Sequence, residues 1–183
     1  PYVVELWSKI LVQTHRSRLM LKYRGFDQTE VQRRFVRMFN ENGVDSDRLI
    51  FEGDNEHRKF LDSYNEIDIA LDTHPYSGGL TTLEALWMGV PVLTLPGHRL
   101  ASNHSKAYLS VSGLAEWICD DANNFVDKGI KFANSPALLA ELRATMRDRM
   151  ELSPIRDSKT YAKNFEHALR KVWKLRCRGQ TCG

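Results

Sequence analysis

Short apolar segments alternate with longer amphipathic segments along this chain, and that alternation is the feature that most limits its fold. The apolar segments are expected to be strands at residues 18–25, 48–53, 68–73, 91–97 and 115–120. Strands that are buried on both faces of a parallel sheet read as continuous apolar runs of this kind. The pattern therefore predicts an α/β fold, in which a doubly wound parallel sheet is covered by helices on both faces.

Helical periodicity fills the intervals between these segments. It predicts helices at residues 3–11, 26–43, 56–67, 100–113, 122–134, 136–150 and 159–176. Asp27 or Thr29 is the expected cap of the second helix, and Gly43 its expected end. The last helix places five apolar side chains on one face: Tyr161, Phe165, Leu169, Val172 and Trp173. All the tryptophans read as core residues, because each falls on an apolar face: Trp7, Trp87, Trp117 and Trp173.

Composition excludes several classes of protein. With 183 residues the chain suits one domain, and its net charge of +3 comes without a basic stripe, so no nucleic-acid partner is expected. No apolar run approaches the roughly 20 residues that cross a bilayer, so no membrane partner is expected. Cys119, Cys177 and Cys182 lack C-x-x-C spacing, which argues against a zinc site and favours a reducing cytoplasm. Cys119 is expected to be buried in a strand.

The segment PYSGGLTTLEALWMGVP, residues 75–91, follows the third expected strand. Ligands of open parallel sheets bind outside the carboxyl ends of the strands, which points to the loops after Phe51, Leu71 and Leu95. In the second of these loops, consecutive glycines allow a ligand to approach the main chain closely. A helix that starts near Thr81 would present unpaired N–H groups, which bind phosphate well.

The same segment also fits an ordinary helix cap. Thr81-x-x-Glu84 matches a capping box, and the local pattern alone favours capping over ligand binding. The segment is neither G-x-G-x-x-G nor a Walker loop, so it supports neither a dinucleotide site nor an ATPase. Asp72, at the end of the third strand, either caps the loop by bonding to Thr73 or contacts a ligand. Isolated histidines near these loops lack the partners that a general base needs: His74, His98 and His104.

A longer run, from DIALDTHPYSGG to the SGL that ends at residue 114, resembles the C-terminal lobe of the O-GlcNAc transferase family, glycosyltransferase family 41. Bacterial members, often fused to tetratricopeptide repeats, carry similar Y-N-G-G-T-T-T-x-E-A-L-W-M-G-V-P-V runs. The resemblance extends from about Leu19 to Trp173 and includes RLIFEG and the closing helix. It implies a Rossmann-like lobe of a two-lobed, GT-B type, inverting glycosyltransferase.

The resemblance also implies roles for individual residues. In the family this lobe holds a sugar nucleotide, usually UDP-linked, and its Gly-Thr-Thr turn wraps the diphosphate. That role falls on Gly79, Leu80, Thr81 and Thr82. An acid near the turn takes the ribose hydroxyls, which would be Glu84. The loop after the second strand reads the base and ribose, and its matching positions are Asn55 (through its backbone), His57 and Phe60.

Two departures from the family pattern bear on the ligand. Leu80 stands where many members have Thr, so one hydroxyl donor to phosphate is missing, and His57 replaces a basic residue of animal members. The Lys that neutralises the departing diphosphate, and the catalytic candidates, lie upstream of the residues matched here. Catalytic residues are therefore expected outside this chain. No D-x-D-like pair follows a strand, so no metal or other cofactor is expected beside the UDP-sugar donor.

The chain opens within a helical pattern and without Met, so we expect it to be part of a longer protein. Residues 1–176 would form one lobe and residues 177–183 a tail, partnered by an N-terminal catalytic lobe. The expected function is transfer of N-acetylglucosamine or another hexose from a UDP-sugar to a protein Ser or Thr in the bacterial cytoplasm, with this part inactive alone. Two alternatives stay open: a non-catalytic interaction module, or a related transferase or epimerase that uses another nucleotide.

Overall fold

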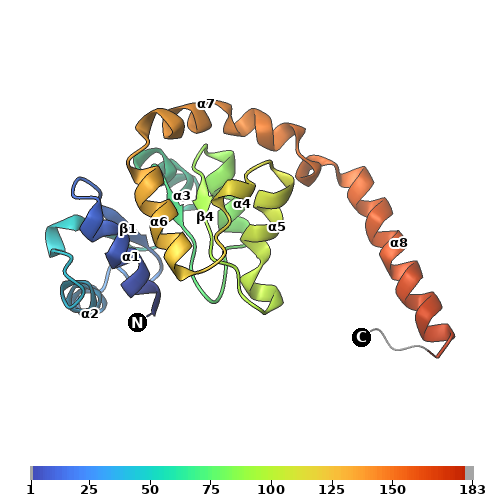
Figure 1. The fold of residues 1–183 in the computed structure, drawn as a ribbon, viewed down its shortest axis with the longest axis horizontal. Coiled ribbons are helices and arrows are strands. Elements are labelled where there is room, and N and C mark those ends of the chain that lie inside the picture. The colour runs from blue at the N-terminus through green and yellow to red at the C-terminus, as the bar shows by residue number, and fades with distance from the viewer. Residues whose placement is uncertain (1, 180–183) are drawn as a thin grey trace.

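Helices and parallel strands alternate through residues 2–179, the part of the chain that this computed structural model describes (Figure 1). The strands are β1 (Leu19–Lys22), β2 (Leu49–Glu52), β3 (Ala70–Leu71) and β4 (Val92–Leu93). The helices are α1 (Tyr2–Gln13), α2 (Thr29–Asn40), α3 (His57–Asp62), α4 (Leu80–Trp87), α5 (His104–Val111), α6 (Ala122–Ala133), α7 (Pro136–Leu152) and α8 (Ser158–Cys177). The alternation predicted from the sequence is thus confirmed.

The strands pair in parallel, as predicted, but each is shorter than its apolar segment. β1 pairs with β2, so that Lys22 lies opposite Glu52, and β3 pairs with β4, so that Ala70 lies opposite Val92. Within the described residues these are two separate two-stranded ladders rather than one continuous sheet. Within each ladder the two strands are parallel, so their carboxyl ends lie together.

The strand predicted at residues 115–120 is wrong. Residues Ala115–Trp117 form a 3-10 turn, and only Ile118 makes a parallel bridge, to Thr94. The pairing stops after Cys119, whose N–H donates to the carbonyl of Thr94 at 2.9 Å. The chain then turns at once into α6, where the Asp121 side chain caps the helix by accepting from the Asn124 N–H. Because the cap residue Asp121 comes only two residues after Cys119, too few residues remain for a strand.

The predicted start of α2 is also wrong in detail. Its N-cap is Gln28, which makes no side-chain cap hydrogen bond, so neither Asp27 nor Thr29 has the expected role. The end is as predicted: the helix stops at Asn40, and Gly43 follows with φ +79°, a left-handed conformation that favours glycine.

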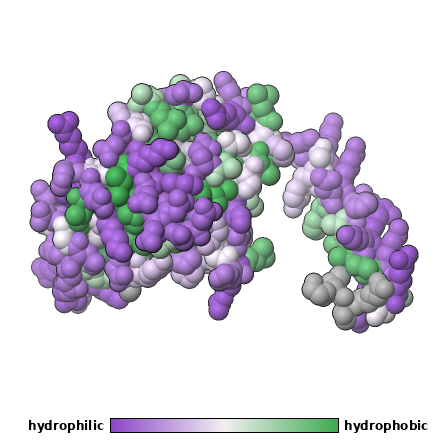
Figure 2. All heavy atoms as spheres, viewed as in Figure 1, coloured by the Kyte–Doolittle hydropathy of each residue, from purple (hydrophilic) through white to green (hydrophobic). Residues whose placement is uncertain are grey.

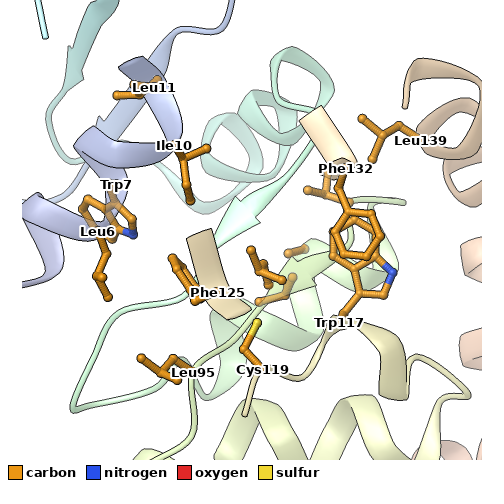
Figure 3. Close-up of a cluster of buried hydrophobic side chains, with 14 of the residues drawn as sticks. Leu6, Trp7, Ile10, Leu11, Leu95, Trp117, Cys119, Phe125, Phe132 and Leu139 are labelled. Atoms are coloured by element: carbon orange, nitrogen blue, oxygen red, sulfur yellow. The ribbon is translucent and has the colours of Figure 1, made fainter. Parts of the chain in front are cut away.

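A large part of the core lies between α1, α6 and the strand β4, and α4, α5 and α7 add further buried side chains (Figure 3). Trp117 is fully buried and stacks on Phe132 of α6, with ring centroids 3.9 Å apart. Gly129 lets α6 approach α1 closely, because a Cβ atom there would lie 2.4 Å from the Cδ1 of Ile10. Cys119 is buried in this core, as predicted, although it lies beyond a bridge and not inside a strand.

The last helix, α8, projects from the body, and its apolar face is exposed (Figures 1 and 2). The side chains predicted to line one face are all at least half exposed: Tyr161, Phe165, Leu169, Val172 and Trp173. The prediction that Trp173 is a core residue is therefore wrong, since it is 70% exposed. Trp87 is half-buried and packs against the core, and the guanidinium groups of Arg147 and Arg156 lie 5.2 and 5.3 Å from its ring centroid.

Cys177 is exposed, and Cys182 lies outside the described residues. Over residues 2–179, no helix is both long and apolar enough to cross a membrane.

Candidate functional site

The candidate site lies where β3 and β4 end side by side. The loop after β3 runs from residue 72 to residue 79 and leads into α4. Since β3 and β4 are parallel, this loop and the one after β4 emerge at the same edge of the ladder. The two loops are joined directly, because the Ser77 N–H donates to the carbonyl of Ala101 at 2.9 Å.

The first turn of α4 presents a row of unpaired amides. Among residues 2–179, the backbone N–H groups of Gly79, Leu80, Thr81 and Thr82 have no hydrogen-bond acceptor. Such groups carry the positive end of the helix dipole and suit an anion. Nothing crowds the approach at Gly79, where a Cβ atom would have no neighbour within 4 Å. These open, unpaired amides make the turn a candidate anion site.

The capping-box interpretation of Thr81 and Glu84 is wrong. The helix begins at Leu80 with Gly79 as its N-cap, and no side chain caps it. Glu84 instead turns toward α3, where its Oε1 lies 2.7 Å from the Nε2 of His57. The His57 side chain is 71% exposed and the Glu84 side chain only 12% exposed, so the carboxylate is largely buried and the imidazole faces solvent. The Glu84 side chain therefore does not cap the N-terminus of α4.

The two threonines of the turn face different ways. Thr81 is exposed, whereas Thr82 is buried, with its Oγ1 2.8 Å from the Oγ of Ser105 on α5. The hydroxyl of Thr82 is therefore part of the packing between α4 and α5. Leu80, at the first position of the helix, is 68% exposed and lies on the outer surface of the turn.

The side chain of Tyr64 contacts the backbone of the first turn of α4. It lies in the 3-10 turn that continues α3, and its hydroxyl donates to the carbonyl of Thr81 at 3.1 Å. Burial, and secondarily the negative charge of Glu84, raise the pKa of Tyr64 above its ordinary value. The phenol therefore stays protonated and remains a donor at neutral pH.

The other predicted residues of the loop after β2 lie on either side of His57. Phe60 is one helical turn further along α3, half-buried, with its ring edge-on to Tyr64 at 5.5 Å between centroids. The ammonium of Lys22 lies 6.0 Å from the Phe60 ring and is paired with Glu52. Asn55 is exposed, and its N–H donates to the side chain of Asp54 at 3.1 Å. Within the described part of the chain, no hydrogen bond joins Asn55 to α4.

The carboxylate of Asp72 lies inside the loop, and the residue is 8% exposed. Its Oδ1 accepts from the N–H of Thr73 at 3.0 Å, which is the loop-capping role considered for it. It also accepts from the N–H of Gly78 at 2.7 Å. Its Oδ2 accepts from the hydroxyl of Thr94 at 2.6 Å.

The isolated histidines lack the partners of a general base. His74 places its Nδ1 3.1 Å from the carbonyl of Leu95, and His98 is exposed. His104 begins α5, and its backbone N–H donates to the Oγ of Ser77 at 3.0 Å. Over residues 2–179, no group of three or more His, Cys, Asp and Glu side chains could hold a metal ion.

Sequence reasoning missed the polar residues that shape the turn from inside: Tyr64, Ser77, Thr94 and Ser105. The sequence carries no local signal for the Tyr64 contact, because its partner lies 17 residues away. Ser77 and Ser105 had a weak signal, since small hydroxyl residues just before or at the start of a helix commonly bond to backbone groups.

Known proteins resemble this chain in sequence and in structure. The sequence pattern described as glycosyl transferase family 41 matches residues 1–165. A probable UDP-N-acetylglucosamine–peptide N-acetylglucosaminyltransferase, SPINDLY of Arabidopsis thaliana, is 32% identical over 99% of this chain and 20% of its own length. A UDP-N-acetylglucosamine–peptide N-acetylglucosaminyltransferase of Caenorhabditis elegans is 26% identical over 95% of this chain and 15% of its own length.

A solved structure is similar as well. A mutant O-GlcNAc transferase of Thermobaculum terrenum superposes with a TM-score of 0.90 at 35% identity. The match covers 98% of this chain and 34% of the solved one. This chain therefore spans about a fifth of the curated relatives and about a third of the solved structure.

Proposed function

Because this chain belongs to glycosyltransferase family 41, we propose that it is the nucleotide-sugar-binding lobe of an inverting glycosyltransferase. The donor would be a UDP-sugar that carries N-acetylglucosamine or another hexose, and the acceptor a Ser or Thr of a protein or peptide. The relatives' names include both UDP-N-acetylglucosamine and a peptide acceptor, which supports this choice of substrates.

The observation that carries the proposal is the row of unpaired amides from Gly79 to Thr82 at the carboxyl edge of parallel strands. Backbone donors fixed in one direction stabilise the negative charge that builds up on a departing diphosphate. Thr81 adds an exposed hydroxyl to this row. Thr82 would contribute its N–H, since its hydroxyl is engaged with Ser105.

The nucleoside would extend from this turn toward α3. Glu84 is the proposed partner of the ribose hydroxyls, because its carboxylate faces away from its own helix terminus and toward His57. His57 and the backbone of Asn55 would then contact the base and ribose, with Phe60 beneath the base. In the bound state a ribose hydroxyl would share or replace the contact of Glu84 with His57.

The proposed assembly places residues 1–176 in one lobe and residues 177–183 in a tail. An N-terminal lobe of the same protein would supply the catalytic residues and most acceptor contacts. We place the whole protein in the cytoplasm of a bacterium, where it would include tetratricopeptide repeats, and no metal ion takes part in the proposed reaction. This lobe alone would bind UDP weakly and transfer no sugar.

Calorimetry with UDP, UDP-N-acetylglucosamine, GDP and CDP tests the proposal on both this chain and the full-length protein that contains it. The expected result is preferential binding of the uridine nucleotides. Absence of UDP binding by the full-length protein would overturn the proposal and favour a non-catalytic interaction module. Tighter binding of GDP or CDP would favour a related transferase or epimerase. Sugar transfer by this chain alone would contradict the assignment of catalysis to another lobe.

A further inference from the structure

The loop between β3 and α4 is closed at both ends by one buried carboxylate. Asp72 directly follows β3, and its Oδ1 accepts from the N–H of Gly78, six residues later, at 2.7 Å. The same oxygen accepts from the adjacent Thr73 N–H at 3.0 Å. Because Gly78 immediately precedes the row of unpaired amides, this bond fixes the point from which that row starts.

A second set of contacts anchors the carboxylate itself. Its Oδ2 accepts from the hydroxyl of Thr94, which is 0% exposed and bridges to Ile118 in the middle of the body. Charged groups this deeply buried are stable when their oxygens accept several hydrogen bonds, and here three donors surround the carboxylate. Asp72 is thus fixed to the strands on one side and to the turn on the other.

The other face of Gly78 is held by α5. The hydroxyl of Ser105 donates to the carbonyl of Gly78 at 3.2 Å, and Ser105 Oγ is 2.8 Å from Thr82 Oγ1. A Cβ atom on Gly78 would lie 2.5 Å from Thr82 Oγ1, so only glycine fits between these hydroxyls and Asp72. Both polar groups of the Gly78 backbone are therefore occupied: Asp72 holds the Ser77–Gly78 peptide unit, and Ser105 holds the Gly78–Gly79 peptide unit.

We propose that Asp72 is a positioning residue for diphosphate binding: by accepting from the Gly78 N–H it holds the amides of Gly79 to Thr82 in the direction of the ligand. This inference rests on the proposed function of the turn. Asp72 does not touch the ligand, and its negative charge beneath an anion site would by itself weaken binding. Its contribution is geometric: it holds the Ser77–Gly78 peptide unit, which immediately precedes the row of unpaired amides.

The test compares UDP with UMP, which lacks the second phosphate, in the full-length protein by direct and competition calorimetry. In Asp72→Ala the preference for UDP over UMP should fall about tenfold, while UMP binding changes less than about twofold, because one oriented charge-assisted contact is lost. Asp72→Asn keeps an oxygen for the Gly78 N–H and should restore most of the preference. A merely structural defect would weaken both nucleotides alike.

Asp68→Ala is the matched control. Asp68 is an exposed carboxylate just before the same strand, so its removal changes the charge equally without touching the turn. The UDP preference should stay within about twofold of the wild type. If Asp72→Ala keeps or increases the preference for UDP, the positioning role is overturned. If the wild type binds no UDP, the proposed function itself fails.

A measurement on the wild type covers the case in which Asp72→Ala does not fold. The Gly78 amide should exchange its hydrogen slowly in the ligand-free protein, since a buried acceptor holds it. The Gly79 amide should exchange fast until UDP is added. Fast exchange at Gly78 before ligand addition would show that Asp72 does not fix the turn, and the inference would be wrong.

Discussion

Leu80 is 68% exposed at the first position of α4, next to the unpaired amides. Leu80→Thr would add a hydroxyl donor beside the unpaired amides. We expect UDP to bind about threefold to tenfold more tightly, the range of one net hydrogen bond. Leu80→Val is the control, because Val has the shape of Thr without the hydroxyl. Equal affinities of the two variants would contradict a phosphate contact at this position.

Cys119 gives the chain a specific dependence on alkaline pH. Burial, the largest cause, raises the pKa of its thiol to about 12 from an ordinary 9.0, with Asp120 and Asp121 adding to the rise and Lys128 opposing it. The folded protein therefore keeps a proton that the unfolded chain loses above pH 9. The stabilisation from the protonated thiol is complete below that pH and is lost as the pH rises toward about 12.

Urea unfolding at several pH values between about 8 and 11 measures this dependence. The free energy of unfolding should fall with pH more steeply in the wild type than in Cys119→Ala, which has no thiol to titrate. Cys177→Ala, at an exposed position on α8, should leave the wild-type slope unchanged. Identical slopes in the wild type and Cys119→Ala would exclude a contribution from this thiol.

Individual site residues were predictable where a family pattern reached them and not where distant contacts define them. The glycines and threonines of the turn form a continuous string, so their resemblance to a known pattern located the turn. The direction of the Glu84 side chain was not predictable, because the sequence Thr81-x-x-Glu84 is compatible both with a capping box and with a contact to His57. The inward orientation of Thr82 depends on Ser105, 23 residues away.

At the scale of elements, two helices end in the same way but in different surroundings. Gly89 follows α4 with φ +84°, and Gly113 follows α5 with φ +71°. In each case the next residue donates back to the helix, Val90 to Ala85 at 2.8 Å and Leu114 to Leu109 at 3.0 Å. The room around the two glycines differs. A Cβ atom on Gly89 would lie 3.0 Å from the carbonyl oxygen of Arg143, whereas a Cβ atom on Gly113 would have no neighbour within 4 Å.

Alanine at these two glycines separates conformational strain from crowding. Gly113→Ala should cost about 1 kcal/mol through the left-handed backbone alone, and Gly89→Ala about 2–3 kcal/mol, because crowding is added. Chemical denaturation of both variants gives the two free energies of unfolding. The difference between them reports how rigidly α7 packs against α4. Equal costs would mean that Arg143 moves away freely.

The order of the elements was predictable because buried parallel strands and amphipathic helices have distinct periods. Their limits were not. The apolar run at residues 115–120 has the composition of a strand, but Asp121 caps α6 and stops the pairing after one bridge. The apolar face of α8 is periodic, yet periodicity states only that a face exists and not what covers it.

At the scale of the whole molecule, the exposed face of α8 governs how the isolated chain behaves in solution. A row of large apolar side chains on a projecting helix favours association with another surface. We expect the isolated chain to self-associate as its concentration rises, and the double variant Leu169→Lys, Trp173→Lys to remain monomeric. Analytical ultracentrifugation over a concentration series measures both.

Two polar residues on the same helix supply the control. Lys163→Ser and Lys174→Ser change exposed positions of α8 without altering its apolar face, so self-association should persist. A wild-type chain that stays monomeric throughout the series would show that this face does not mediate self-association. Association that survives the Leu169 and Trp173 substitutions would move the contact elsewhere on the molecule.

If the turn binds a nucleotide as proposed above, the bonds that close the loop after β3 also affect how fast the nucleotide binds. Asp72, Ser77 and Ser105 hold this loop in one conformation before any ligand arrives. A receptor that needs no rearrangement loses little conformational entropy on association, and encounter alone then limits its on-rate. Differences in affinity among nucleotides at this turn would consequently arise in how long each one stays, and not in how fast each one arrives.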